Sequence, residues 1–113
     1  MAAAGLWTTA SDLALFVIDL EKACTNKQGG ILPHEMAMEM LKRQSENCGL
    51  GLFLGGGGEH LSFNHSGSNA GFRCHFVGYP HTGQGLVVMT NSDNGESLID
   101  ETMKAVSRAY NWP

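Results

Sequence analysis

The sequence predicts an α+β domain in which helices come first, an antiparallel sheet of about four strands follows, and a last helix packs on that sheet. Three observations predict this order. Apolar residues recur every three or four positions before residue 48, they alternate with other residues after it, and the helical spacing returns near the C-terminus. Twelve of the 15 glycines lie between Gly49 and Gly95, so we expect a turn-rich second half. We therefore divide the single domain 1–113 into a helical part (1–48) and a sheet with its closing helix (49–113).

Two helices are expected in the helical part. Thr9 and Asp12 have the spacing of a capping box, in which an N-cap hydroxyl is followed three residues later by an acid. The apolar stripe of the helix that follows consists of Leu13, Phe16, Val17, Leu20 and Cys24. A polar, glycine-rich turn over 26–30 ends this helix. Pro33 suits the first turn of a shorter helix, whose buried side we assign to Met36, Met40 and Leu41.

Four strands and one helix are expected in the second part. The strands are predicted at 50–54, 61–65, 72–77 and 85–91, with reversals at the glycine run 55–58 and at 80–83. The fourth strand is an almost continuous apolar run, which is typical of a strand buried on both faces. Residues 92–95 offer several N-caps for the last helix. Its apolar stripe consists of Ile99, Met103, Val106 and Tyr110.

Charge and hydropathy exclude two classes of protein. The chain has 7 Lys and Arg against 11 Asp and Glu, which makes a net charge of −4. Because phosphate binding needs clustered basic residues, we expect no nucleic-acid partner. No apolar run approaches the roughly 20 residues that cross a bilayer, so we expect no membrane segment in this chain.

Metal ions and cofactors are not expected either. The three cysteines Cys24, Cys48 and Cys74 have no paired spacing, which argues against a disulfide framework and a zinc ribbon. The histidines lack the regular ligand spacing of zinc motifs, and His75 is out of phase with its apolar neighbours, as on a solvated face. The glycine run 55–58 is followed by a strand, whereas a phosphate cradle needs a helix there. We therefore predict neither a metal nor a cofactor.

The stretch from Phe63 to Phe72 is the best candidate for chemistry. It places His65 at the end of a predicted strand, followed by small residues whose backbone can approach a ligand. Such a strand end can offer an imidazole, a hydroxyl and free backbone N–H groups to one substrate. The alternative interpretation is a polar hairpin loop that carries a surface histidine.

His65-Ser66-Gly67, followed by Ser68-Asn69-Ala70-Gly71-Phe72, resembles the third conserved box of the serine β-lactamase and penicillin-binding-protein superfamily. It is similar to the branch in which His-x-Gly replaces Lys-Thr-Gly, as in class C-like esterases and D-aminopeptidase-type hydrolases. Three further segments resemble other parts of these proteins in the same order: 4–13, 49–52 and 85–91.

This resemblance implies roles for five residues. His65 would occupy the base position of the third box and assist acylation electrostatically. The backbone N–H of Ser68 would be the second donor of an oxyanion hole. Gly67 would let a substrate lie along the strand edge, Ser66 would bind a substrate carboxylate, and Asn69 would also line the binding site.

The resemblance also implies residues that this chain does not contain. These hydrolases use a nucleophilic serine in Ser-x-x-Lys and a second box of the form Tyr-x-Asn or Ser-x-Asn. None of the eight serines here has a lysine three residues later, and neither tyrosine begins Tyr-x-Asn. We therefore expect the C-terminal part of a larger hydrolase, acting on a β-lactam, a D-amino-acid peptide or an ester. The isolated chain should be inactive, and its exposed sheet edge should favour self-association. The alternative is a stand-alone, non-catalytic binding or scaffold module with a degenerate sheet.

Overall fold

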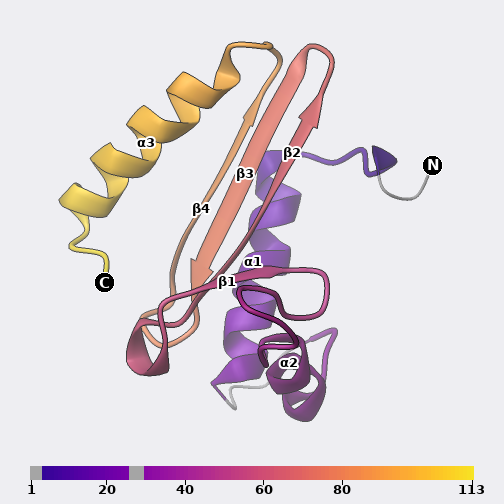
Figure 1. Cartoon of the computed structure of the whole chain (residues 1–113), viewed down its shortest axis with the longest axis vertical. Helices are drawn as coiled ribbons and strands as arrows, with labels where there is room; N and C mark the ends of the chain where they lie inside the picture. The colour runs from indigo at the N-terminus through magenta and orange to yellow at the C-terminus, as the bar shows by residue number, and fades with distance from the viewer. Residues whose placement is uncertain (1–3, 26–29) are drawn as a thin grey trace.

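The computed structural model describes residues 4–25 and 30–113 and has the predicted α+β architecture (Figure 1). Its α-helices are α1 (Ala10–Cys24), α2 (His34–Met40) and α3 (Gly95–Ala109). A short 3₁₀ helix, η2, spans Gly58–His60. Its strands are β1 (Phe53–Gly55), β2 (Ser62–Asn69), β3 (Phe72–Tyr79) and β4 (Gln84–Thr90). The expected turn at 26–30 lies, apart from Gly30, outside the described residues.

The four strands form one antiparallel sheet in the order β1-β2-β3-β4, so each strand pairs with its neighbour in sequence. β2 and β3 form the long central hairpin, in which Phe63 pairs with Gly78 near the base and Asn69 pairs with Phe72 at the tip. The predicted meander of about four strands is confirmed.

α1 and α3 pack on opposite faces of β3 and β4. Side chains alternate between the two faces of a strand. Phe76 lies on the α1 face, where its ring meets Phe16 edge-on at 6.2 Å. Arg73 and Thr90 lie on the opposite face, where both side chains approach Gly95 at the start of α3. α1 begins as predicted, because the hydroxyl of Thr9 accepts a hydrogen bond of 3.1 Å from the Asp12 N–H.

The hydrophobic core lies between α1, α2 and the base of the sheet. Phe63 and Leu20 are its largest fully buried side chains. Its remaining buried members are Val17, Ala23, Ala37, Leu41, Leu52 and Leu54. The prediction for α2 is wrong at Met36, which is 51% exposed. Ala37 faces the core instead, one turn before Leu41, because α2 begins at His34 and presents that side to α1.

Three strand and helix predictions need correction. β1 spans only Phe53–Gly55, because Gly49–Leu52 form a turn closed by the Gly49 N–H on the Leu52 carbonyl at 2.9 Å. β4 is half-buried rather than buried on both faces, since it lies at the edge of the sheet. Tyr110 is 68% exposed because α3 ends at Ala109.

Candidate functional site

The five candidate residues His65, Ser66, Gly67, Ser68 and Asn69 lie inside β2, not in a loop after a strand. The predicted strand end at His65 is therefore wrong by four residues. Residues 66–69 continue the ladder because each pairs with a residue of β3, from His75 to Phe72. Only Ala70 and Gly71 form the turn. Gly71 has φ +77°, a conformation that the second central residue of a type II turn requires.

The outer edge of β2 is open beyond Asn64. β1 pairs with β2 only over 62–64, and on this side of β2 no described strand lies beside 65–69. Asn69 and Phe72 close a two-residue turn and face each other, so the backbone groups of Asn69, Gly67 and His65 point toward β3. The backbone groups of Ser66 and Ser68 consequently point outward, toward the open edge.

The side chains of the candidate residues divide between the two faces of the sheet. His65 shares the α1 face with Phe63, and its exposed ring lies 5.6 Å from the ring of Phe53. Ser66 and Ser68 project on the α3 face, where Ser66 is paired with His75. A ligand along the edge could therefore meet the imidazole from one face, both serine hydroxyls from the other, and the two outward N–H groups between them.

Gly67 is constrained by its neighbour across the hairpin. A Cβ atom at this position would lie 2.6 Å from the Sγ of Cys74, its partner on β3. A side chain at residue 67 would have to displace that sulfur. Packing against Cys74 therefore favours glycine at position 67. The family resemblance implies a second reason, which is access of a substrate to the strand edge.

His75 is half-buried rather than on a solvated face. It lies on the side of the sheet that α3 covers. Burial lowers the pKa of its imidazole, the Asp100 carboxylate on α3 opposes this effect, and electrostatic interaction with His65 adds to it. The lowered pKa favours the neutral form of the imidazole that is paired with Ser66 across the hairpin.

Two residues at the hairpin tip were missed by the sequence interpretation. Arg73 and Asp93 hold the turn after Asn69 through hydrogen bonds to its backbone. Asp93 belongs to the segment that we assigned only to the cap of α3. No signal within the sequence connects it with Gly71, because the two are 22 residues apart.

Three triplets of the chain, 45–47, 62–64 and 92–94, match the Ser-x-Asn form of the second box. Ser62 is buried within β2, and the Ser92 hydroxyl accepts a hydrogen bond of 3.1 Å from the Asn94 N–H in the turn before α3. Ser45 lies in a bridge with Cys48. All three serines thus have local structural roles.

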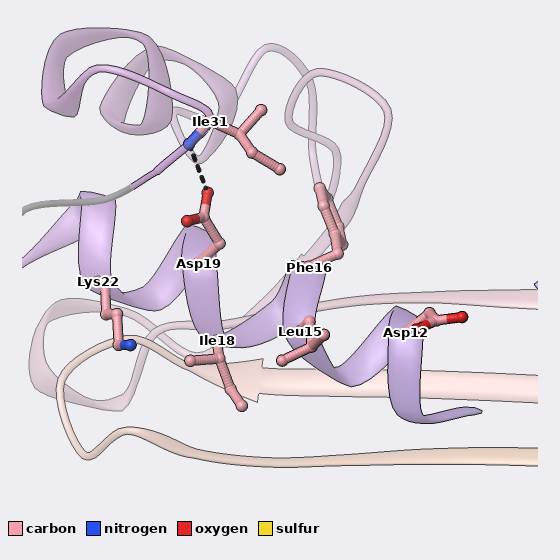
Figure 2. A pocket seen from close by; sticks show the side chains of 7 residues that line it. All are labelled: Asp12, Leu15, Phe16, Ile18, Asp19, Lys22 and Ile31. Atoms are coloured by element: carbon pink, nitrogen blue, oxygen red, sulfur yellow. Dashed lines mark hydrogen bonds between the residues drawn. The ribbon is translucent and has the colours of Figure 1, made fainter. Parts of the chain in front are cut away.

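Two hollows of the described surface lie away from the open edge. One is on the outer side of α1, where Asp12, Leu15, Phe16, Ile18, Asp19, Lys22 and Ile31 line it (Figure 2). There the Asp19 carboxylate accepts hydrogen bonds from the Gly30 and Ile31 N–H groups at 2.7 and 3.2 Å. Another hollow is lined by Glu59, His60, His81, Thr82, Asn111 and Pro113. The candidate residues therefore form an exposed strand edge.

A family model described as Beta-lactamase matches residues 1–109, nearly the whole chain. The chain belongs to the β-lactamase family. The predicted family is thereby confirmed. Comparison with curated proteins and with solved structures gave no match.

Two further observations concern this β-lactamase-family chain. In residues 4–25 and 30–113, no three His, Cys, Asp or Glu side chains come together as a metal site would require. No helix in the described ranges has both the length and the apolar character needed to cross a membrane.

Proposed function

We propose that this chain supplies one wall of the active site of a β-lactamase-related serine hydrolase that cleaves its substrate through an acyl-enzyme. The observation that carries the proposal is the outward backbone of Ser66 and Ser68 on an open strand edge, directly beside the exposed imidazole of His65. An edge of this kind can hold the carbonyl group of a substrate by its backbone, as acyl transfer requires.

Each candidate residue then has a chemical task. The Ser68 N–H is the second oxyanion-hole donor; removing one such donor typically lowers the rate by about 10²–10³-fold. His65 occupies the base position and hydrogen-bonds the substrate or the nucleophile's partner. Ser66 and Asn69 bind polar groups of the substrate, and Gly67 leaves the edge accessible.

The nucleophile comes from outside these 113 residues, because no serine here has the Ser-x-x-Lys pattern. We propose that the isolated chain is inactive and that the longer hydrolase acts on a β-lactam, a D-amino-acid peptide or a carboxylic ester. The three substrates share an acyl carbonyl that an oxyanion hole on β2 would polarise.

The test uses a chromogenic β-lactam and a p-nitrophenyl ester with the isolated chain and with the longer protein. We expect turnover only by the longer protein, and a lower acylation rate after His65→Ala. His81→Ala, an exposed histidine in the turn after β3, is the matched control and should leave the rate unchanged. Turnover by the isolated chain, or an unchanged rate in the His65 variant, would overturn the proposal.

A binding module is the second candidate function, favoured by the same open edge. An extended peptide can add to such an edge as a further strand through main-chain hydrogen bonds alone. In that case the isolated chain should bind a cell-wall peptide without hydrolysing it, and Ser68→Pro should abolish binding, because proline lacks the outward N–H. An upstream reading frame with Ser-x-x-Lys and Tyr-x-Asn would decide for the hydrolase.

We also propose that the isolated chain self-associates through β4. By the alternation of the β3–β4 ladder, Gly85, Val87 and Met89 point their backbone groups away from β3. The strand 84–90 contains no charged residue and no proline, which are the usual protections of an edge strand. Sedimentation velocity should show oligomers that Met89→Lys dissociates and Ser68→Lys, on the other edge, does not. A monodisperse wild-type monomer would contradict this.

A further inference from the structure

The tip of the β2–β3 hairpin is held by polar contacts. Nη1 of Arg73 donates hydrogen bonds to the carbonyl oxygens of Asn69 at 2.6 Å and Phe72 at 2.8 Å. The same nitrogen lies 3.4 Å from Oδ1 of Asp93. That Asp93 oxygen accepts a hydrogen bond of 2.8 Å from the Gly71 N–H. One guanidinium and one carboxylate therefore tie both ends of the turn together.

The same contacts connect the tip to the start of α3. The Thr90 hydroxyl donates a hydrogen bond of 3.0 Å to the carbonyl of Arg73. A Cβ atom at Gly95 would collide with Thr90 and crowd the Cβ of Arg73, so α3 begins in close contact with β3. Asp93 lies in the short turn between Thr90 and Gly95. The Arg73 side chain is only 22% exposed, although its partner Asp93 is 68% exposed.

Apolar packing contributes little at this position. Phe72 is 52% exposed, and Ala70 and Asn69 are exposed. The buried cluster ends at the other end of the hairpin, around Phe63. The backbone of residues 68–71 is consequently placed by the Arg73 and Asp93 contacts and by the ladder with β3.

We propose that Arg73 and Asp93 are positioning residues, which hold the end of β2 so that the outward N–H of Ser68 keeps the place an oxyanion requires. This inference rests on the proposed function. Donors act at about 2.7–3.1 Å from the oxyanion, and a displacement of about 1 Å can cost about 100-fold in rate. Asn69, whose carbonyl Arg73 binds, is the next residue after Ser68, so releasing the carbonyl moves the donor directly.

The kinetic experiment compares Arg73→Met, Asp93→Asn and Arg73→Lys in the longer hydrolase with an ester substrate. We expect about a 10- to 100-fold fall in kcat for Arg73→Met, with KM within about twofold, since the tip orients the reacting carbonyl more than it binds substrate. Arg73→Lys keeps a donor at the tip and should recover part of the rate. Arg108→Met, in the last turn of α3, is the matched control. An unchanged kcat in Arg73→Met would overturn the proposal.

A second measurement needs no activity and separates this inference from the proposed function. Hydrogen exchange of the isolated chain should become faster at the amides of 66–72 that pair across the hairpin, about tenfold in Arg73→Met and about two- to fivefold in Asp93→Asn, and should stay unchanged over 53–64. Wild-type exchange at the tip in both variants would overturn the positioning role, whatever the chemistry. Faster exchange together with no effect of His65→Ala on the rate would overturn the proposed function and leave the tip contacts established.

Discussion

The base and the tip of the β2–β3 hairpin are built from different interactions. At the base, Phe63 is fully buried against Phe76, and its partner Gly78 is buried against its ring. At the tip, Arg73 and Asp93 bind backbone groups in a partly hydrated setting. The base therefore supplies most of the stability, whereas the tip determines the geometry of the candidate site.

This difference has a simple energetic origin. Burying a large aromatic side chain contributes several kcal/mol, whereas a single hydrogen bond contributes about 0.5–1.5 kcal/mol net. Changes at the base should consequently alter the free energy of unfolding, and changes at the tip should alter local order and catalysis. The four predictions that follow test this division.

The largest effect is expected at the base. Phe63→Ala should lower the free energy of unfolding by about 3–5 kcal/mol, because it removes a fully buried ring and leaves a cavity. Phe72→Ala, at the exposed tip, is the matched control and should change it by about 0.5 kcal/mol or less. Urea denaturation measures both. Equal losses for the two variants would remove the distinction between base and tip.

A smaller effect at the base is expected from Gly78→Ala. A Cβ atom at Gly78 would overlap the ring of Phe63 and lie 2.9 Å from Cγ1 of Val17. Such overpacking should cost about 1–3 kcal/mol. Gly57→Ala is the control, since that position has extended backbone and open space around it, and it should be neutral or slightly stabilising. Thermal melting of the two variants tests the prediction.

Glu21 makes the base sensitive to pH. Its side chain is buried on α1, and burial raises its pKa to about 7, although a hydrogen bond of 3.0 Å from the Tyr79 N–H favours the charged form. A pKa that is higher in the folded state than in the unfolded state means that the native protein retains the proton longer. Stability is therefore greatest at low pH and decreases as pH rises from about 4.5 to about 7.

Glu21→Gln should remove this decrease, which we expect to be of the order of 1–2 kcal/mol because solvent near the carboxylate screens part of the effect. Glutamine keeps an acceptor for the Tyr79 N–H without carrying a charge. Denaturation curves at pH 5 and pH 8 measure the slope, and Glu101→Gln, an exposed acid on α3, is the control. The same variant should lower the pKa of Cys24, which burial and then the Glu21 charge raise to about 11. An unchanged slope would contradict the assignment.

The smallest stability effect belongs to the tip. Asp93→Asn weakens a 3.4 Å ion pair whose carboxylate is 68% exposed, so the loss should be about 0.2–1 kcal/mol. Glu39→Gln on α2, which breaks the exposed pair with Lys42, should cost no more. Urea denaturation measures both variants. A loss above about 2 kcal/mol for Asp93→Asn would place the tip among the main stabilising contacts and contradict the comparison.

Much of the fold was predictable because its signals are local. The Thr9 cap, the apolar stripe of α1 and the alternation in β2 and β3 each arise from residues within one turn or one strand. The predictions were wrong where burial depends on contacts with other elements. Met36 is exposed because Ala37 is the residue of α2 that packs against α1, and β4 is half-buried because it is an edge strand.

Some features of the candidate site were likewise predictable from the sequence, and others were not. Residues 65–69 were found from the sequence because the third-box pattern is contiguous and resembles a known family. Their placement inside β2, the outward direction of the Ser66 and Ser68 backbone, and the contacts of Arg73 and Asp93 were not predictable. Each depends on pairing between segments that are distant in sequence.

The sequence by itself determined the α+β class, the order of the elements and the family, because these follow from short-range periodicity and from a contiguous motif. Only the tertiary structure decided which edge of β2 is open, which face of the sheet each of α1 and α3 covers, and which contacts hold the hairpin tip. The physical reason is that a strand's hydrogen-bonding edge and a side chain's burial depend on its neighbours in space. Those neighbours can be distant in sequence, as Glu21 and Tyr79 are, 58 residues apart.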